Sequence, residues 1–507
     1  MSKLLFMMLT AMTGLGGALM VGPIVPMYVY YFYASFRPQA LWLWQLSAYP
    51  EFNWSLYTAG FALLSYLPWV FGIVGSQKDP NRRVFPYFNW AHRAMIAFGI
   101  WMTLSYLFSN NMDRSWIYYE DFLKIFIMYL LGSQVIRSYK QIHVLYLIVT
   151  FSLGYIAFEM VQIYFTTGYL VLFRRGFAGL DNNGAALVLA MGIPLSYFAW
   201  EFTRGWYRWG FLLIIPIIAE CIMSSYSRGA MISALAVAPF YLLYSRKKTF
   251  LLICMGMMAA AVPIVAGDEI KERFFSVNDR EQDDSFQSRM ASFRAAYLIA
   301  NDYPVFGAGI RCSNLLTLKY GADMEGRTIH NTYLQIAADA GWTGMLLYLL
   351  LLAAAIFAMW RSRRRLWKRT DEESVRAVAM LGGIECALLT FMVGILALSL
   401  ELVEVPYLMM LIGSQFWSIL NAQVTPEPGT AAAAKKPGFV FQARVRPPTR
   451  PTVEQPIILQ RATEEPVPMP TRASVSGPPS GTKYLTPPTV PDFPFPPRAG
   501  GTTGGAS

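Results

Sequence analysis

Long apolar runs recur along most of the chain and limit what it can fold into. A helix of about 20 apolar residues spans about 30 Å, the thickness of a bilayer core. Hydrophobic residues make up 55% of the 507 residues and charged residues only 14%. Soluble domains carry about 25% charged residues, so the deficit indicates a membrane protein. The predicted fold is an all-α integral membrane protein with about 12–13 transmembrane helices.

The predicted spans are separated by short polar turns. They cover residues 58–75, 93–108, 117–136, 144–166, 184–200, 208–226, 229–244, 249–266, 331–360, 377–400 and 405–421. The N-terminal stretch, up to about Tyr33, is expected to be retained, because its positively charged n-region is too weak for a signal peptide. It is expected to be a helix with a break near Pro23. Its composition fits either one crossing or two.

The chain divides into three predicted parts. Residues 1–180 form N-terminal transmembrane helices, and residues 181–421 form a second transmembrane domain. The second domain includes the polar segment 267–329, here called the external loop, which is expected to carry short helices. Residues 422–507 are rich in proline and are predicted to be a disordered, cytoplasmic tail.

Basic residues predict which side of the membrane each loop occupies. A block of arginines and lysines, 361–369, follows the span 331–360 and marks the cytoplasmic side. Counting back alternately places the external loop and the segment 167–183 outside, and most basic loops inside. The net charge of +11 therefore reflects topology and contact with lipid headgroups, and no nucleic-acid partner is expected.

Motifs for metals and cofactors are not found in the sequence. The four cysteines are widely spaced and form no CxxC pair, which makes a zinc or redox site improbable. The chain has no nucleotide-binding loop, no HExxH and no DxD-like run. The sequence therefore predicts chemistry without a cofactor or a metal ion.

Arginines on the predicted outer side need an explanation other than topology, because the positive-inside rule concerns the cytoplasmic side. Arg228 is the most informative, since it occupies a very short turn between two spans, where an ionisable group suggests function. Snorkelling to headgroups is the structural alternative. Guanidinium groups form paired contacts with phosphate oxygens, which indicates a lipid-linked phosphate or diphosphate. The outer arginines are Arg174, Arg175, Arg228, Arg273, Arg280, Arg289, Arg294, Arg311 and Arg327.

His330 marks the point where the external loop returns to an apolar run. A histidine can act as a general base near neutral pH, and Asn331 and Tyr333 are available to hold an acceptor or orient the ring. An interfacial histidine with a satisfied hydrogen bond is the structural alternative. The run Asp181-Asn182-Asn183 begins an earlier span, where helix capping accounts for one polar side chain but not for three.

Four motifs follow one another between about residues 180 and 350. They are Asp181-Asn182-Asn183 before a span with Pro194, Ser225–Ala230, Ser288–Arg294 with Asn301–Gly309, and His330–Gln335 with Gly341–Gly344. In this order they resemble the O-antigen ligase/polymerase superfamily of bacterial membrane glycan transferases. The Asp-Asn-Asn and Tyr-Ser-Arg-Gly forms are most similar to the probable O-glycosylation ligases associated with exosortase systems. Phe293 replaces a tryptophan common there, and the N-terminal half is similar only in hydropathy.

The resemblance implies a GT-C-like enzyme of the bacterial inner membrane, with its active site facing the periplasm. It would move a glycan from undecaprenyl diphosphate to a hydroxyl of a lipid core, a glycan or a protein, without nucleotide or metal. His330 would deprotonate or orient the acceptor, while Arg228 and Arg289, with Arg174 or Arg175, would hold the diphosphate. The supporting residues would be Asp181, Asn182, Asn183, Asn331 and Tyr333.

Two other functions fit the sequence. A polymerase that joins carrier-linked repeat units would share the same motifs. A multi-pass transporter or flippase would instead be expected to show internal repeats or charged residues near the middle of the membrane. No repeat is visible, and the intramembrane acids are few: Glu159, Glu220 and Glu385, with Glu401 and Glu404 at the outer end.

Overall fold

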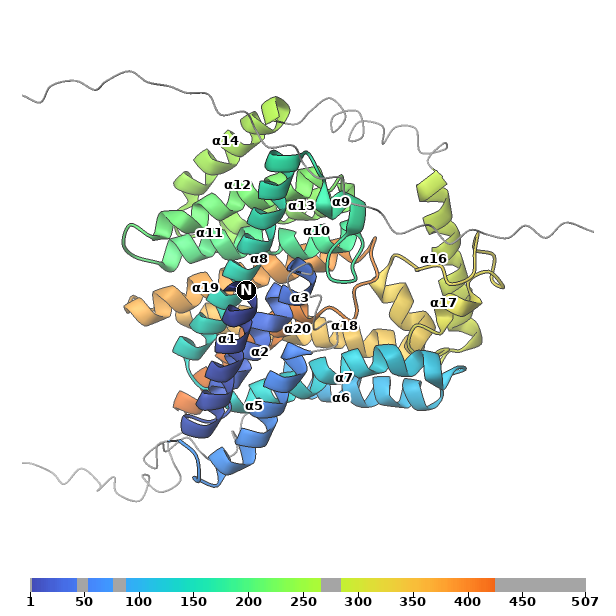
Figure 1. Ribbon diagram of the computed structural model, residues 1–507, viewed down its shortest axis with the longest axis horizontal. Coiled ribbons are helices and arrows are strands. Elements are labelled where there is room, and N and C mark those ends of the chain that lie inside the picture. The colour runs from blue at the N-terminus through green and yellow to red at the C-terminus, as the bar shows by residue number, and fades with distance from the viewer. Residues whose placement is uncertain (1, 43–52, 76–87, 266–283, 425–507) are drawn as a thin grey trace, which may run out of the picture. The chain divides into compact units, whose positions relative to one another are not determined.

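The computed structural model describes residues 2–42, 53–75, 88–265 and 284–424 (Figure 1). Within these ranges the chain is helical, and its only β interaction is an isolated bridge between Phe177 and Leu180. The predicted tail beyond residue 424 and the start of the external loop, 267–283, lie outside the described residues. The chain is an all-α membrane protein, which confirms the predicted fold class.

The helices follow the predicted spans closely. They are α1 (Ser2–Met20), α2 (Ile24–Phe36), α3 (Pro38–Leu41), α5 (Trp54–Val70), α6 (Trp90–Leu107), α7 (Met112–Val135), α8 (Tyr139–Thr167), α9 (Val171–Arg175), α10 (Asn182–Ala190), α11 (Gly192–Phe202), α12 (Arg208–Ser224), α13 (Arg228–Tyr244), α14 (Lys248–Val265), α16 (Asp284–Asp302), α17 (Ser313–Leu316), α18 (Thr332–Leu366), α19 (Glu372–Gly394) and α20 (Glu404–Val424). The predicted span 184–200 thus corresponds to two consecutive helices, α10 and α11.

Five helical stretches of the described chain are long and apolar enough to cross a bilayer. They are Lys3–Met20, Tyr139–Thr167, Asn182–Phe202, Thr332–Leu366 and Glu372–Gly394. The helices Arg228–Tyr244 and Lys248–Met257 are apolar but shorter. The finding supports a multi-pass protein, and the larger number of crossings expected from hydropathy stays a prediction.

The N-terminal stretch forms two helices that separate just before Pro23, where a break was expected. α1 and α2 pack against each other and are joined by a turn in which Gly22 has a φ of 107°. A Cβ atom on Gly22 would lie 2.6 Å from the Trp69 ring, so only glycine fits this position without movement of its neighbours. In the external loop, α16 is a helix of 19 residues, longer than the short helices expected there.

α18 is broken at Gly341, which has a φ of 74° and a ψ of 172°. The carbonyls of Ala338, Asp339 and Ala340 accept hydrogen bonds of 2.8 to 2.9 Å from the segment 303–309 and from α6. These bonds satisfy groups that the break would otherwise leave unpaired in an apolar environment. The part after the break exceeds the about 20 residues needed to cross a bilayer, so the part before it, 332–340, is available to build a site.

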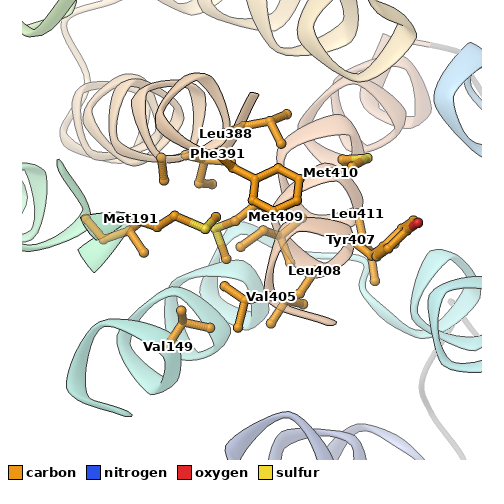
Figure 2. Packing of buried hydrophobic residues seen from close by; sticks show 14 of the residues in the cluster. Val149, Met191, Leu388, Phe391, Val405, Tyr407, Leu408, Met409, Met410 and Leu411 are labelled. Carbon is orange, nitrogen blue, oxygen red and sulfur yellow. The ribbon is translucent and has the colours of Figure 1, made fainter. Parts of the chain in front are cut away.

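The core gathers side chains from helices that are distant in sequence. Figure 2 shows residues of α8, α19 and α20 clustered with Met191 from the α10–α11 junction. Phe391 and Met409 are fully buried in this cluster. α18 and α19 are also joined by an ion pair of 3.1 Å between Arg363 and Glu385. This packing holds α18 and α19 together, and the candidate site is built on their ends.

Candidate active site

A tight turn places the Asp181 run at the start of α10. Phe177 and Leu180 exchange two backbone hydrogen bonds of 2.9 Å, and the two residues between them have φ values of 54° and 82°. The Asp181 side chain accepts a hydrogen bond of 2.8 Å from the first turn of α10, which confirms the predicted cap. Asn183 donates to Asp181 and to Asn182, at 3.4 and 3.2 Å, so the run forms one connected polar group.

Asn182 connects this group to the turn that precedes α13. Its Nδ2 atom donates to the carbonyl of Ser225 at 2.9 Å, across 43 positions of sequence. The ring of Tyr226, whose φ is 56°, packs on the ring of Phe173 from α9 with centroids 5.0 Å apart. Two motifs that were separate in the sequence therefore form one unit, and Arg228 begins the helix that leaves it.

Arg228 is the first residue of α13 and follows the Ser227 cap. A cation at a helix N-terminus opposes the helix dipole, so the stability of α13 does not explain an arginine there. The free N–H groups of that end and the guanidinium both favour an anion. Arg174 and Arg175, by contrast, are exposed in the last turn of α9, where a cation suits the dipole. The geometry favours Arg228 over these two residues for binding an anion.

The backbone at His330 is left-handed, with a φ of 58°. Such a conformation costs a residue other than glycine about 1–3 kcal/mol and is concentrated at functional sites. The two following residues anchor it to the segment 395–400 after α19. Asn331 donates to the carbonyl of Leu396 at 3.0 Å, and the Thr332 hydroxyl donates to the carbonyl of Leu398 at 2.8 Å. The position of His330 is thus determined by a segment distant in sequence.

Asn331 and Tyr333 contact the protein rather than open space. The Oδ1 atom of Asn331 accepts a hydrogen bond of 3.0 Å from the first turn of α18 and so caps the helix. The Tyr333 hydroxyl donates to the carbonyl of Met392 on α19 at 3.1 Å. Both side chains therefore hold the start of α18 in place, and they orient His330 indirectly.

Burial and nearby arginines lower the pKa of His330 to about 4. Burial of the ring is the largest cause and the charge of Arg289 is the next, while the charge of Asp181 opposes them. Arg327 and Arg311 lower the pKa further. A histidine with this pKa is neutral at pH 7, which is the form that accepts a proton. Arg289 and Asp181, both predicted from sequence, thus lie within electrostatic reach of the predicted histidine.

α16 carries Arg289 and packs against α18 (Figure 1). The hydroxyl of Ser288 donates to Asp323 at 3.0 Å, and Arg327 forms an ion pair with Asp323, also at 3.0 Å. These contacts attach α16 to the end of the external loop, directly before His330. Arg327 is thereby partly neutralised by a carboxylate, and its contacts fix the helix that carries Arg289.

A buried polar network that was not predicted lies one to two turns into α18. The Gln335 amide donates to Asp339 at 2.9 Å, and the Ser313 hydroxyl donates to Asp339 at 2.5 Å. Arg311 forms an ion pair of 2.7 Å with Glu401. An acid within an apolar run was a usable signal for Asp339, because ionisable groups are costly in a membrane. No sequence pattern marked Gln335 or Ser313.

The O-antigen ligase family model matches residues 217–349 of the chain. This range runs from α12 into α18 and contains Arg228, Arg289 and His330, whereas the Asp181 run precedes it. No curated protein matches the chain. The match supports the O-antigen ligase/polymerase superfamily, whose members are glycosyltransferase or ligase enzymes. The resemblance to the exosortase-associated branch stays a prediction.

Proposed function

We propose that the chain transfers a glycan from undecaprenyl diphosphate to a hydroxyl acceptor at the outer face of the bacterial inner membrane. One observation supports this most: a histidine held in a strained, left-handed backbone conformation lies within electrostatic reach of Arg289, Arg311 and Arg327. A proton acceptor and groups that suit a departing diphosphate are the two requirements of such a transfer. The family match supports a glycosyltransferase, and the donor and acceptor are part of the proposal.

The proposed reaction is a single displacement at the anomeric carbon of the donor. The acceptor oxygen forms the new bond to this carbon as the bond to the diphosphate oxygen breaks. The acceptor proton passes to the neutral ring of His330, and the bonding electrons leave with the diphosphate. Arg228 and Arg289 hold the diphosphate and stabilise the negative charge that develops on it, with arginine favoured over lysine because its fork contacts two oxygens.

Positioning residues complete this scheme. Asp181 and Asn182 join the turn that carries Arg228 to α10, and Asp181 lies within electrostatic reach of His330. Asn331 and Tyr333 hold the start of α18 against α19. Because the donor carries its own leaving group, the reaction as proposed needs neither nucleotide nor metal.

Purified protein and a carrier-linked donor provide the test. Transfer is followed without nucleotide and with a chelator present, and the product is identified by its acceptor. Transfer to a lipid core or protein supports a ligase, and elongation of a carrier-linked repeat unit supports a polymerase. Movement of intact donor across a vesicle membrane without any new glycosidic bond would replace the proposal with a flippase.

A separate experiment tests on which side of the membrane the site lies. Single cysteines at Glu325 and Lys368, both exposed, should react from opposite sides of the membrane. In intact cells, an impermeant maleimide should label the first and not the second. The parent chain is the control, since three of its four cysteines are buried. Equal labelling at both positions would contradict an outward-facing site.

A further inference from the structure

A polar cavity of about 430 Å³ lies between α2, α5 and α7, outside the arginine and histidine site. A second cavity of about 240 Å³ shares several lining residues with it, among them Arg37, Asp121 and Glu404. Known ligand pockets have volumes of about 300–1,000 Å³, so the two together are large enough for a small organic ligand. The proposed reaction does not use the larger of the two.

The lining combines aromatic rings with groups of both charges. Tyr30, Tyr33 and Trp54 supply rings, while two cations, Arg37 and Lys124, face two acids, Asp121 and Glu404. An anion site would be dominated by cations, and a lipid-chain site would lack charges. Hydroxyl groups both donate and accept hydrogen bonds, so a balanced wall with aromatic faces suits a polyhydroxylated ligand.

Glu404 carries an atom to which the described residues offer no hydrogen-bond partner. The carboxylate lies beside the Tyr30 hydroxyl, within electrostatic reach of Arg37, Asp121 and Lys124. Its Oε1 atom is nevertheless buried and accepts no hydrogen bond from the described residues. A buried acceptor of this kind is costly unless something donates to it. A sugar hydroxyl in the cavity would supply the missing donor.

The smaller cavity extends this space toward the histidine. Its lining includes Leu180, directly before Asp181, and Arg311, whose charge acts on the His330 ring. It also includes Leu400, whose backbone N–H donates to the Thr332 hydroxyl at 2.9 Å. The space therefore borders residues that hold and surround the proposed base.

We propose that this double cavity binds the sugar chain of a substrate and delivers its reacting end to His330, with Glu404 accepting a hydrogen bond from a sugar hydroxyl. The substrate class rests on the proposed function, but the cavity and its lining do not. An apolar groove of about 630 Å³ between α1, α2 and α8 provides a contrast, because aromatic and aliphatic side chains such as Phe6, Phe32 and Leu147 dominate its lining. Sugar binding is therefore assigned to the polar cavity alone.

Two soluble probes separate the cavity from the diphosphate site. One is the oligosaccharide released from the carrier-linked donor by mild acid and freed of phosphate, and the other is inorganic pyrophosphate. Glu404→Gln puts an amide in place of the carboxyl group and should weaken binding of the oligosaccharide about two- to tenfold, the effect of losing one hydrogen bond. It should leave the affinity for pyrophosphate unchanged. Arg228→Lys should do the reverse, and Glu373→Gln, an exposed acid at the start of α19, should change neither.

Two further substitutions keep the test conclusive if Glu404→Gln misfolds. Asp121→Asn and Trp54→Phe change the same wall at two other points and should also weaken oligosaccharide binding. Equal oligosaccharide affinity in the parent and all three variants would overturn the proposal, as would a parent that binds pyrophosphate and no oligosaccharide. If the oligosaccharide binds and Glu404→Gln weakens it, but no transfer occurs with any acceptor, the cavity stands and the proposed function fails.

Discussion

Two histidines in this chain, His92 and His330, have opposite surroundings. His92 on α6 is fully buried, and its ring nitrogens lie 3.2 Å from the Tyr129 hydroxyl and 2.8 Å from the Gln415 amide oxygen. Asn89 approaches the same ring at 3.1 Å. His330 is partly exposed, and its ring makes no hydrogen bond within the described part of the chain.

The difference lies in which groups fill the space around each ring. Neutral hydrogen-bonding groups on α6, α7 and α20 satisfy His92, so it functions as a cross-link between helices. Charged groups surround His330, and they act on its protonation without occupying its nitrogens. A ring that is neutral, partly exposed and without a partner can accept a proton from a substrate. Four predictions test whether this contrast separates structure from chemistry.

Removing the two rings should have very different effects on transfer. His330→Ala should lower kcat/KM by about 10²–10⁴-fold, the usual contribution of a general base, with carrier-linked donor left unconsumed. His92→Gln should keep the activity of each folded molecule, because no substrate reaches that ring. Rates are normalised to folded protein by size-exclusion chromatography. Similar losses in both variants would remove the distinction between the histidines.

The proposed diphosphate site should also require arginine rather than any cation. Arg228→Lys should lower transfer by about 10–100-fold, since a charge-assisted hydrogen bond contributes about 1.5–3 kcal/mol. Arg208 provides a matched control, because it also begins a helix, α12, and its guanidinium lies over Trp200 and Trp209. Arg208→Lys should leave donor turnover nearly unchanged. Full activity of Arg228→Lys would point to headgroup snorkelling instead.

Substitutions of the two histidines should affect stability in the opposite order to their effect on transfer: His92 should matter more than His330. His92→Leu removes one hydrogen-bond partner of Gln415 and of Tyr129 and should lower the free energy of unfolding by about 1–3 kcal/mol. His330→Gly should retain stability, because glycine adopts the φ of 58° without strain. Thermal unfolding of both variants in detergent measures the difference. A larger loss for His330→Gly would show that the His330 ring is itself structural.

The smallest expected effect is on the pH profile. With a pKa of about 4, His330 is the neutral base at all higher pH values, so kcat/KM should fall only as the pH drops through about 4. Arg289→Gln removes a charge that lowers this pKa, and the acid limb should therefore move upward, toward the ordinary histidine value of about 6.5. The residual rate of the variant, scanned from pH 3.5 to pH 8, measures the shift. If the acid limb of the pH profile does not move, the charge of Arg289 does not act on the pKa of His330.

The sequence and the family resemblance predict individual residues of the site more readily than the relations between them. His330, Arg228 and Arg289 stay predictions as site residues, whereas the predicted cap at Asp181 is confirmed. Arg174 or Arg175 was expected to assist Arg228 and Arg289, because a list of outer arginines does not show which end of a helix each one occupies. The role of Tyr333 was also left general, since its contact with α19 joins positions 59 residues apart.

The sequence by itself determined the all-α membrane fold and most helix boundaries. The length of an apolar run and the residues of a turn are local properties of the sequence. Because unpaired backbone groups are costly in lipid, such runs fold as helices, which pair these groups internally. It also determined where the helices begin at Asp181, Ser227 and Asn331, because a cap acts within one turn.

Only the tertiary structure decided what surrounds His330. The break at Gly341, the buried network around Asp339 and the anchoring of Thr332 by residues 398–400 all depend on contacts between distant segments. The lowered pKa of His330 has the same origin, because burial and the charges of Arg289 and Asp181 act through space. Electrostatic and hydrogen-bond energies depend on distance and burial, which no local sequence pattern encodes.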